Sequence, residues 1–232
     1  MNQENSRCDV GRVRALIFDL DGTLADTVDA IRDAVNDTMR AYGYPEKTYE
    51  QVLHAIGNGA RMIVRRCMPP AEATDEGKVD RVLASYDLAY ARTYLHTRRC
   101  YDGVTEMLAQ LHARGYRLAV LSNKQDAYVK GLVAQLIDDG IIEIAMGQTA
   151  LPTKPDATVP RLIAHQLCVD IRECAMVGDS HVDVQTAKNA GMLSVGCSWG
   201  YGGRASLEQA GADVVIDHPC ELTALFDACL DS

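Results

Sequence analysis

Four polar stretches of this sequence each follow a short apolar segment. Their side chains are those of Asp19 and Asp21, Ser122 and Asn123, Lys154, and Asp179 with Asp183. Phosphoryl transfer needs a nucleophile, an acid for the leaving oxygen, and cations that neutralise the phosphate oxygens. Carboxylates, a hydroxyl group and an ammonium group can fill these roles. We therefore treat the four stretches as one candidate site for phosphoryl transfer.

Each stretch taken alone also has a purely structural interpretation. The segment Asp19–Thr23 could be a turn, Asp179 could precede a helix as its N-cap, and Lys154 could be a surface charge. A calcium loop starting at Asp19 is excluded by spacing, because Leu24 and Ala30 occupy the positions where glycine and glutamate are needed. The joint occurrence of the stretches is what favours a site.

Carboxylates alone would repel a phosphate, so this site needs a cation. A divalent ion held by Asp19 and Asp179 would remove the repulsion, and an oxygen-only ligand set without nearby histidine or cysteine suits Mg²⁺. Lys154 would add a second positive charge. Asp21, farther from the ion, would be protonated more easily and is our candidate general acid.

The elements that must position these groups are short strands alternating with amphipathic helices. The expected strands are 15–18, 117–123, 141–147, 174–178, 193–196 and 213–217. This alternation is typical of a parallel sheet, in which the carboxyl ends of the strands form the ligand crevice. We predict an α/β protein with a Rossmann-like parallel sheet core.

One region breaks the alternation, because residues 25–95 show only helical patterns. They are interrupted at Gly43–Pro45, Gly57–Gly59 and Met68–Pro70. A connection of that length without structure would be unusual. We therefore predict an inserted all-α cap domain at 25–95, with residues 1–24 and 96–232 forming the core.

Composition narrows the possible partners. The chain has 232 residues with a formal net charge of −9, so no basic field would gather nucleic acid or an anionic membrane. The eight cysteines include no CxxC pair, and no apolar run approaches the roughly 18 residues of a spanning helix. We expect a cytoplasmic protein without an export signal, a monomer or homodimer whose partner is a small molecule.

The four stretches resemble the ordered motifs of haloacid dehalogenase (HAD) superfamily phosphatases. They are DLDGTLADT at Asp19–Thr27, LSN at Leu121–Asn123, Lys154 with Pro155, and GDSHVD at Gly178–Asp183. The resemblance covers nearly the whole chain, and the insertion after the first motif is similar to that of members with a helical cap. It implies the HAD fold and phosphatase activity.

The resemblance also implies roles for the motif residues. Asp19 would become an aspartyl-phosphate, and Asp21 would protonate the leaving group and then activate water. Ser122 and Lys154 would hold the phosphate, with the backbone N–H of Asn123. Mg²⁺ would be bound by Asp19, the main-chain carbonyl of Asp21 and Asp179, and Asp183 would support the ion from outside or through water.

Within the superfamily, the chain resembles the phosphoglycolate phosphatase family at Ile56–Arg61, Ser122–Lys124 and Trp199–Gly202. This implies hydrolysis of 2-phosphoglycolate to glycolate and phosphate. The loop Gly57-Asn58-Gly59 would close over the carboxylate end of the substrate, which Arg61 could bind. The alternative is a plain helix stop and start, followed by an exposed helix arginine.

Other activities of the superfamily remain open or are disfavoured. Inorganic pyrophosphatase, sugar-phosphate phosphatase, nucleotidase and hexose-phosphate mutase are open, because the cap decides among them. Dehalogenases lack the second acid that Asp21 supplies. Phosphonate-cleaving relatives use a cap lysine, and the cap offers only Lys47 and Lys78, in a different context.

Two readings lie outside this group of enzymes. A phospho-accepting receiver domain also has strand-end aspartates, but it needs only about 120 residues, has no helical insertion and orders its motifs differently. A non-catalytic scaffold with this fold is disfavoured because every catalytic group is present.

Overall fold

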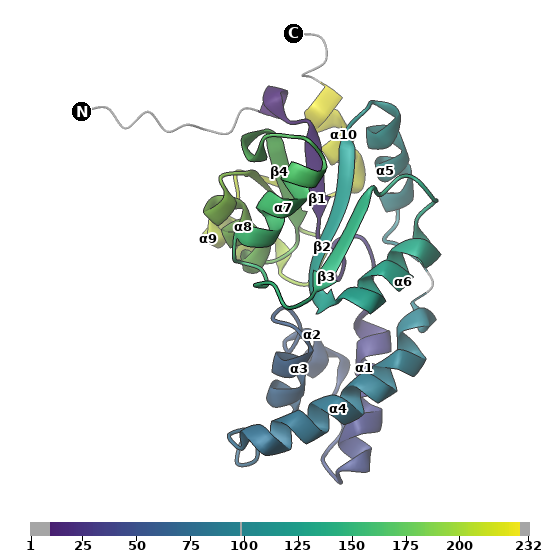
Figure 1. Cartoon of the computed structure of the whole chain (residues 1–232). Coiled ribbons are helices and arrows are strands. Elements are labelled where there is room, and N and C mark those ends of the chain that lie inside the picture. The colour runs from purple at the N-terminus through teal and green to yellow at the C-terminus, as the bar shows by residue number, and fades with distance from the viewer. Residues whose placement is uncertain (1–9, 98, 228–232) are drawn as a thin grey trace, which may run out of the picture.

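The computed structural model describes residues 10–97 and 99–227 of the chain. Its centre is a parallel sheet of six strands, as predicted, and the strand order is β3-β2-β1-β4-β5-β6 (Figure 1). The strands are β1 Ala15–Phe18, β2 Arg117–Gln125, β3 Ile144–Gln148, β4 Cys174–Gly178, β5 Leu193–Cys197 and β6 Val214–Ile216.

Alternate side chains of the strands feed two separate hydrophobic cores, because successive residues of a strand point to opposite faces. Leu16 and Phe18 pack in one core, with the helices α5 (Val104–Ala113), α6 (Asp126–Leu136) and α10 (Pro219–Asp227). Ala15 and Ile17 pack in the other, with α7 (Thr158–Gln166) and α8 (His181–Ala190). The helix α9 (Gly203–Ala210) lies beside α8 (Figure 1).

The region between β1 and α5 is helical, as the sequence predicted. It contains α1 (Val28–Ala41), α2 (Tyr49–Leu53), α3 (Ala60–Cys67) and α4 (Glu76–Thr93). All three interruptions named above fall between these helices. The helices bury a third hydrophobic core of their own, in which α1 packs along α4.

Two short connections join the helical region to the sheet, and they run side by side. Ala25 bridges to Cys100, and the N–H of Tyr101 donates to the carbonyl of Leu24 over 3.0 Å. Because the third core lies beyond these connections, we propose the division into a core (1–24 and 96–232) and a cap (25–95). Residues 1–9, 98 and 228–232 of that division lie outside the described residues.

Several strand ends differ from the prediction. β2 continues to Gln125, two residues beyond the expected end, whereas β3 starts at Ile144 and β6 covers only three residues. The extension of β2 depends on a second pairing of Gln125 with Gln148 after an irregularity in the ladder. Such a tertiary pairing has no local signature in the sequence.

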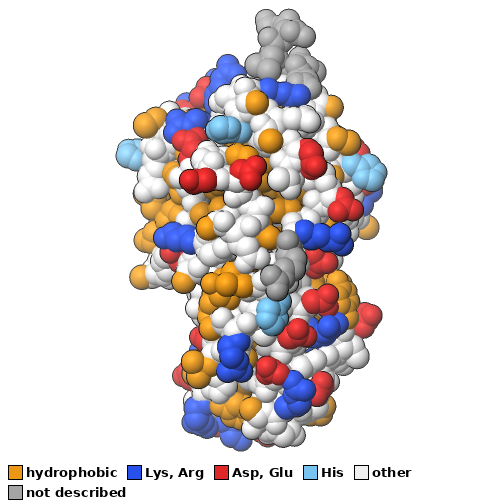
Figure 2. Space-filling model, turned by 90° about the vertical axis from the view of Figure 1, so that its right-hand side faces the viewer, with side chains coloured by type: hydrophobic (Ala, Val, Ile, Leu, Met, Phe, Trp, Pro, Cys, Tyr) orange, Lys and Arg blue, Asp and Glu red, His pale blue; other side chains and the backbone are white. Residues whose placement is uncertain are grey.

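The surface and the cysteines complete the description. Lys and Arg side chains are interspersed with Asp and Glu over the face in Figure 2. Of the six described cysteines, all free, Cys67, Cys100, Cys174 and Cys197 are buried, whereas Cys168 and Cys220 are exposed; Cys8 and Cys229 lie outside the described residues. Within the described part of the chain, no helix has both the length and the hydropathy of a membrane span.

Candidate active site

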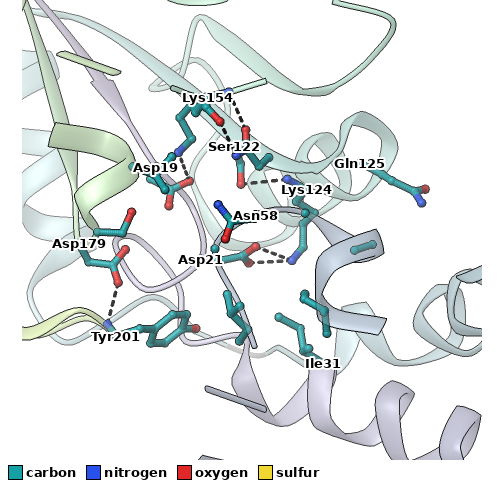
Figure 3. A pocket seen from close by; sticks show the side chains of 18 of the residues that line it. Asp19, Asp21, Ile31, Asn58, Ser122, Lys124, Gln125, Lys154, Asp179 and Tyr201 are labelled. Carbon is teal, nitrogen blue, oxygen red and sulfur yellow. Dashed lines mark hydrogen bonds and ion pairs between the residues drawn. The ribbon is translucent and has the colours of Figure 1, made fainter. Parts of the chain in front are cut away.

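The four predicted motifs meet at the carboxyl edge of the sheet. Asp19 follows β1, Ser122 lies near the end of β2, Lys154 follows β3, and Asp179 follows β4. All four line one cavity between the sheet edge and the cap (Figure 3). The parallel topology thus brings together residues up to 160 positions apart, since the first and last are Asp19 and Asp179 (179 − 19).

Lys154 is the buried cation of this edge. Its Nζ lies 2.8 Å from Asp19 Oδ1 and 2.7 Å from Asp183 Oδ1. Burial alone would lower the pKa of Lys154, but Asp183 and Asp19 outweigh it and raise this pKa above its usual value. The Asn123 side chain fixes the lysine backbone, donating to the carbonyl of Lys154 (3.0 Å) and accepting from its N–H (2.9 Å).

Three buried carboxylates, those of Asp19, Asp179 and Asp183, place oxygen atoms within 4.8 Å of one another. Burial raises the pKa of Asp19 to about 6, although Lys154 opposes the shift. Burial, with repulsion from Asp183 and Asp19, raises the pKa of Asp179 to about 8. One lysine therefore does not balance the negative charge that these groups carry when ionised.

This donor set fits a hard divalent cation. The ligand atoms are carboxylate oxygens, which Mg²⁺ prefers, and a cation would relieve the repulsion among them. Asp19 and Asp179 could hold the ion. Asp183 also lies in the cluster, but its Oδ1 faces Lys154 and its Oδ2 accepts from the Ser180 N–H (3.1 Å) and hydroxyl (2.6 Å) at the start of α8.

Asp179 is held by a loop that packs against it closely. Its Oδ2 accepts from the N–H of Tyr201 (2.7 Å), and its Oδ1 accepts from the hydroxyl of Thr23 (3.1 Å). A Cβ added at Gly22, where φ is +88°, would lie 2.5 Å from Asp179 Oδ2, and one at Gly200 would lie 2.3 Å from Asp179 Cβ. Only glycine leaves room for this carboxylate.

Asp21 lies apart from the three-carboxylate cluster. Both of its carboxylate oxygens are 2.7 Å from Lys124 Nζ, and the hydroxyl of Thr27 donates to Oδ1 over 2.7 Å (Figure 3). Ser122 lies next to this pair, and its Oγ accepts from the N–H of Lys124 over 3.3 Å. The two aspartates of the first motif therefore face different partners.

The cap contributes the opposite wall of the cavity. Gly57, Asn58 and Gly59, in the loop before α3, line it. Arg61 does not line it: its guanidinium lies 2.6 Å from Glu76 and 2.5 Å from Asp80, on the outside of the cap. Both carboxylates belong to α4, and they hold the Arg61 side chain on the outer face of α3. The structure therefore does not bring Arg61 to the other predicted site residues.

Sequence reasoning missed several residues of the cavity, and two of them, Lys124 and Tyr201, make contacts across the site. Both occur in segments that resemble relatives, but the sequence alone gives neither residue a role. Tyr201 accepts at its hydroxyl from the N–H of Thr27 (3.0 Å), so it links the loop after β5 to the start of the cap. Lys124 could have been predicted from its position, because it directly follows the expected strand 117–123 and lies two residues after Ser122.

Comparison with known proteins agrees with this architecture. The haloacid dehalogenase-like hydrolase model matches residues 16–197. The chain therefore belongs to the haloacid dehalogenase-like hydrolase family. The match spans β1 to β5 and thus includes all four motifs.

Individual relatives have more specific names than the family. Phosphoglycolate phosphatase of Pseudomonas putida is 34% identical over 224 residues, which cover 94% of this chain and 80% of the relative. The phosphoglycolate phosphatase of Vibrio vulnificus strain CMCP6 is 31% identical over 225 residues, which cover 95% of this chain and 97% of the relative. Among solved structures, that of a predicted phosphoglycolate phosphatase from Haemophilus somnus 129pt matches with a TM-score of 0.84 and 25% sequence identity. The match covers 92% of this chain and 98% of that chain.

Proposed function

We propose that this protein is a Mg²⁺-dependent phosphomonoesterase that hydrolyses 2-phosphoglycolate to glycolate and inorganic phosphate. The observation that carries the proposal is the pair of differently held aspartates: Asp19 lies with Lys154 in the three-carboxylate cluster, whereas Asp21 lies outside it. The names of the relatives support the choice of substrate.

The first step forms an aspartyl-phosphate. A carboxylate oxygen of Asp19 attacks phosphorus, the bond from phosphorus to the ester oxygen breaks, and Asp21 gives a proton to that oxygen as glycolate leaves. Lys154 and Ser122, both buried at the cavity, bind the phosphate oxygens. Asp19, the main-chain carbonyl of Asp21 and Asp179 would hold Mg²⁺, which would supply positive charge where negative charge accumulates on the phosphate.

The second step returns the enzyme to its starting state. Asp21 takes a proton from water as the water oxygen bonds to phosphorus, and the bond from phosphorus to Asp19 breaks. Phosphate leaves, and Asp21 holds the proton for the next turnover. The cap, with Gly57, Asn58 and Gly59 at the cavity, excludes bulk water while the ester is bound.

The test is phosphate release with Mg²⁺ across 2-phosphoglycolate, pyrophosphate, sugar phosphates and nucleotides, with Asp19→Asn as the blank. We expect kcat/KM for 2-phosphoglycolate to exceed the others by about 100-fold or more, since this ratio measures differential binding of the transition state. A flat profile, or a maximum on pyrophosphate or on a sugar phosphate, would reject the substrate while leaving the mechanism. Absence of any turnover that depends on Asp19 would reject both.

A further inference from the structure

The cavity contains two lysines in very different positions. Among the described residues that line it, Lys154 and Lys124 are the lysines, and no arginine lines it. Lys154 is enclosed by Asp19 and Asp183 in the sheet-edge cluster. Lys124 lies on the side of the cavity nearer the cap, where Figure 3 shows its ammonium group directed at Asp21.

The ammonium group of Lys124 is shared between the core and the cap. Its Nζ lies 2.7 Å from both oxygens of Asp21 and 4.9 Å from the centre of the Tyr90 ring on α4. The side chain is only 6% exposed. The two oxygens of Asp21 accept from at most two of the three N–H donors of this ammonium group, and the Tyr90 ring attracts the cation without adding a negative charge. Lys124 therefore keeps the capacity to bind a further anionic group.

Among the described residues, the cap adds no positively charged side chain to the wall around Lys124. Most of its cap side chains are apolar or aromatic: Ile31, Leu53, Ile56, Ile63, Tyr86 and Tyr90. Asp87, which accepts from Gln125 Nε2 over 2.7 Å, is the acidic side chain of the cap at this wall and would repel an anion. An anionic group on the cap side of the cavity therefore has Lys124 as its nearest lysine partner.

We infer that Lys124 determines specificity by binding an anionic group on the leaving part of the substrate. The inference deepens the proposed function, in which Asp21 faces the ester oxygen. Because Lys124 contacts Asp21 directly, an anion within a few bonds of the ester oxygen lies beside the ammonium group. The substrate class is then phosphate monoesters with a carboxylate close to the ester oxygen, and the residue that recognises the carboxylate is Lys124 rather than Arg61.

The test compares two esters that differ only at this end: 2-phosphoglycolate, and 2-hydroxyethyl phosphate, in which an uncharged hydroxymethyl group replaces the carboxylate. The quantity measured is the ratio of their kcat/KM values at saturating Mg²⁺. We expect Lys124→Met to lower the ratio by about 10- to 100-fold, the size of a lost charge-assisted hydrogen bond. Lys124→Arg should restore part of it, because it keeps the charge.

Two further variants serve as references. Lys130→Met makes the same substitution at an exposed lysine that pairs with Asp126 on α6, and should leave the ratio unchanged. Arg61→Met tests the competing candidate from the sequence and should also leave it unchanged. Melting temperatures of all variants show whether each is folded, and Lys124→Arg keeps the test decisive if Lys124→Met unfolds.

The outcomes separate the inference from the proposed function. Equal losses on both esters in Lys124→Met would overturn the inference, because Lys124 would then act only through Asp21. A collapse of the ratio in Arg61→Met alone would also overturn it. If the wild type shows no preference for 2-phosphoglycolate but prefers pyrophosphate, and Lys124→Met abolishes that preference, 2-phosphoglycolate is rejected and anion binding by Lys124 stands.

Discussion

The two walls of the cavity differ in the kinds of side chain that form them. On the sheet side, Asp19, Asp179 and Lys154 are buried and held by partners that come from separate strand ends. On the cap side, the wall is a short loop and a set of apolar and aromatic side chains, and Arg61 pairs with carboxylates outside the cavity. The candidate reacting groups thus depend on the sheet, whereas we propose that substrate choice depends on Lys124, at the end of β2, and on the cap wall that it faces.

The two walls also differ in how their charges are placed. The sheet side gathers three carboxylates around one lysine in a buried position, where unpaired charge is expensive. The cap pairs its charges at the surface, where water screens them. Equivalent substitutions on the two sides should therefore change activity and stability by very different amounts.

The largest effect is expected at the nucleophile. Asp19→Asn should lower kcat by about 10⁴-fold or more, because removing an attacking group eliminates the covalent route. The melting temperature should not fall, since the change removes one of three mutually repelling carboxylates. Phosphate release and thermal unfolding measure the two effects.

The matched control is Asp29→Asn, at a cap side chain that is 74% exposed. It should alter neither quantity. Substantial turnover by Asp19→Asn would contradict the assignment of Asp19 and with it the contrast between the two walls.

The next effect is expected at the buried cation. Lys154→Met should destabilise the protein by about 3–5 kcal/mol, because Asp19 and Asp183 are left as buried charges without their partner. Denaturant unfolding without divalent metal measures this. A loss no larger than that of a surface lysine variant would show that water reaches the cluster.

The third effect is the pH dependence of stability without metal. The pKa values of Asp19 (about 6) and Asp179 (about 8) are raised above those of the unfolded chain. Between about pH 4 and 8 the folded state thus binds protons that the unfolded state has released, so the free energy of unfolding should fall as pH rises. Melting temperatures across this range should decline, and saturating Mg²⁺ should flatten the decline.

Asp179→Asn should weaken this pH dependence in the metal-free protein. A metal-free protein whose stability rises over the same range would contradict the burial of unbalanced carboxylates. A decline that Mg²⁺ leaves unchanged would show that the ion does not bind the cluster.

The smallest effect is expected on the outside of the cap. Arg61→Ala should leave the melting temperature nearly unchanged, because its ion pairs with Glu76 and Asp80 are exposed. Its kcat/KM should also stay at the wild-type value. A marked loss of activity would mean that the cap closes far enough in solution to bring Arg61 to the substrate.

Much of the fold and of the sheet-side site could be predicted from the sequence. Short apolar runs, glycine stops and a helical interval between Ala25 and Tyr94 define the parallel sheet and its insertion. Once the strands are parallel, the residues after them must share an edge. The convergence of Asp19, Ser122, Lys154 and Asp179 follows from that topology.

The cap side could not be predicted in the same way. The direction of Arg61 depends on Glu76 and Asp80, which come from another helix, and Lys124 meets Tyr90 only because β2 continues beyond Asn123. Tyr201 reaches Thr27 across 174 positions of the chain. Such contacts depend on tertiary packing and leave no periodic or local signal.

The central claim, that Asp19 is the attacking group and Asp21 the proton carrier, has a direct test. Asp21→Asn is mixed with an aryl phosphate, whose leaving group needs no protonation, so phosphoryl transfer can proceed while hydrolysis of the phospho-enzyme is slowed. We expect a burst of phenolate equal to the enzyme concentration, and a phosphorylated peptide that contains Asp19 and loses its phosphoryl group in hydroxylamine. No burst and no phosphorylated Asp19, with phosphate still released at the wild-type rate, would contradict the claim.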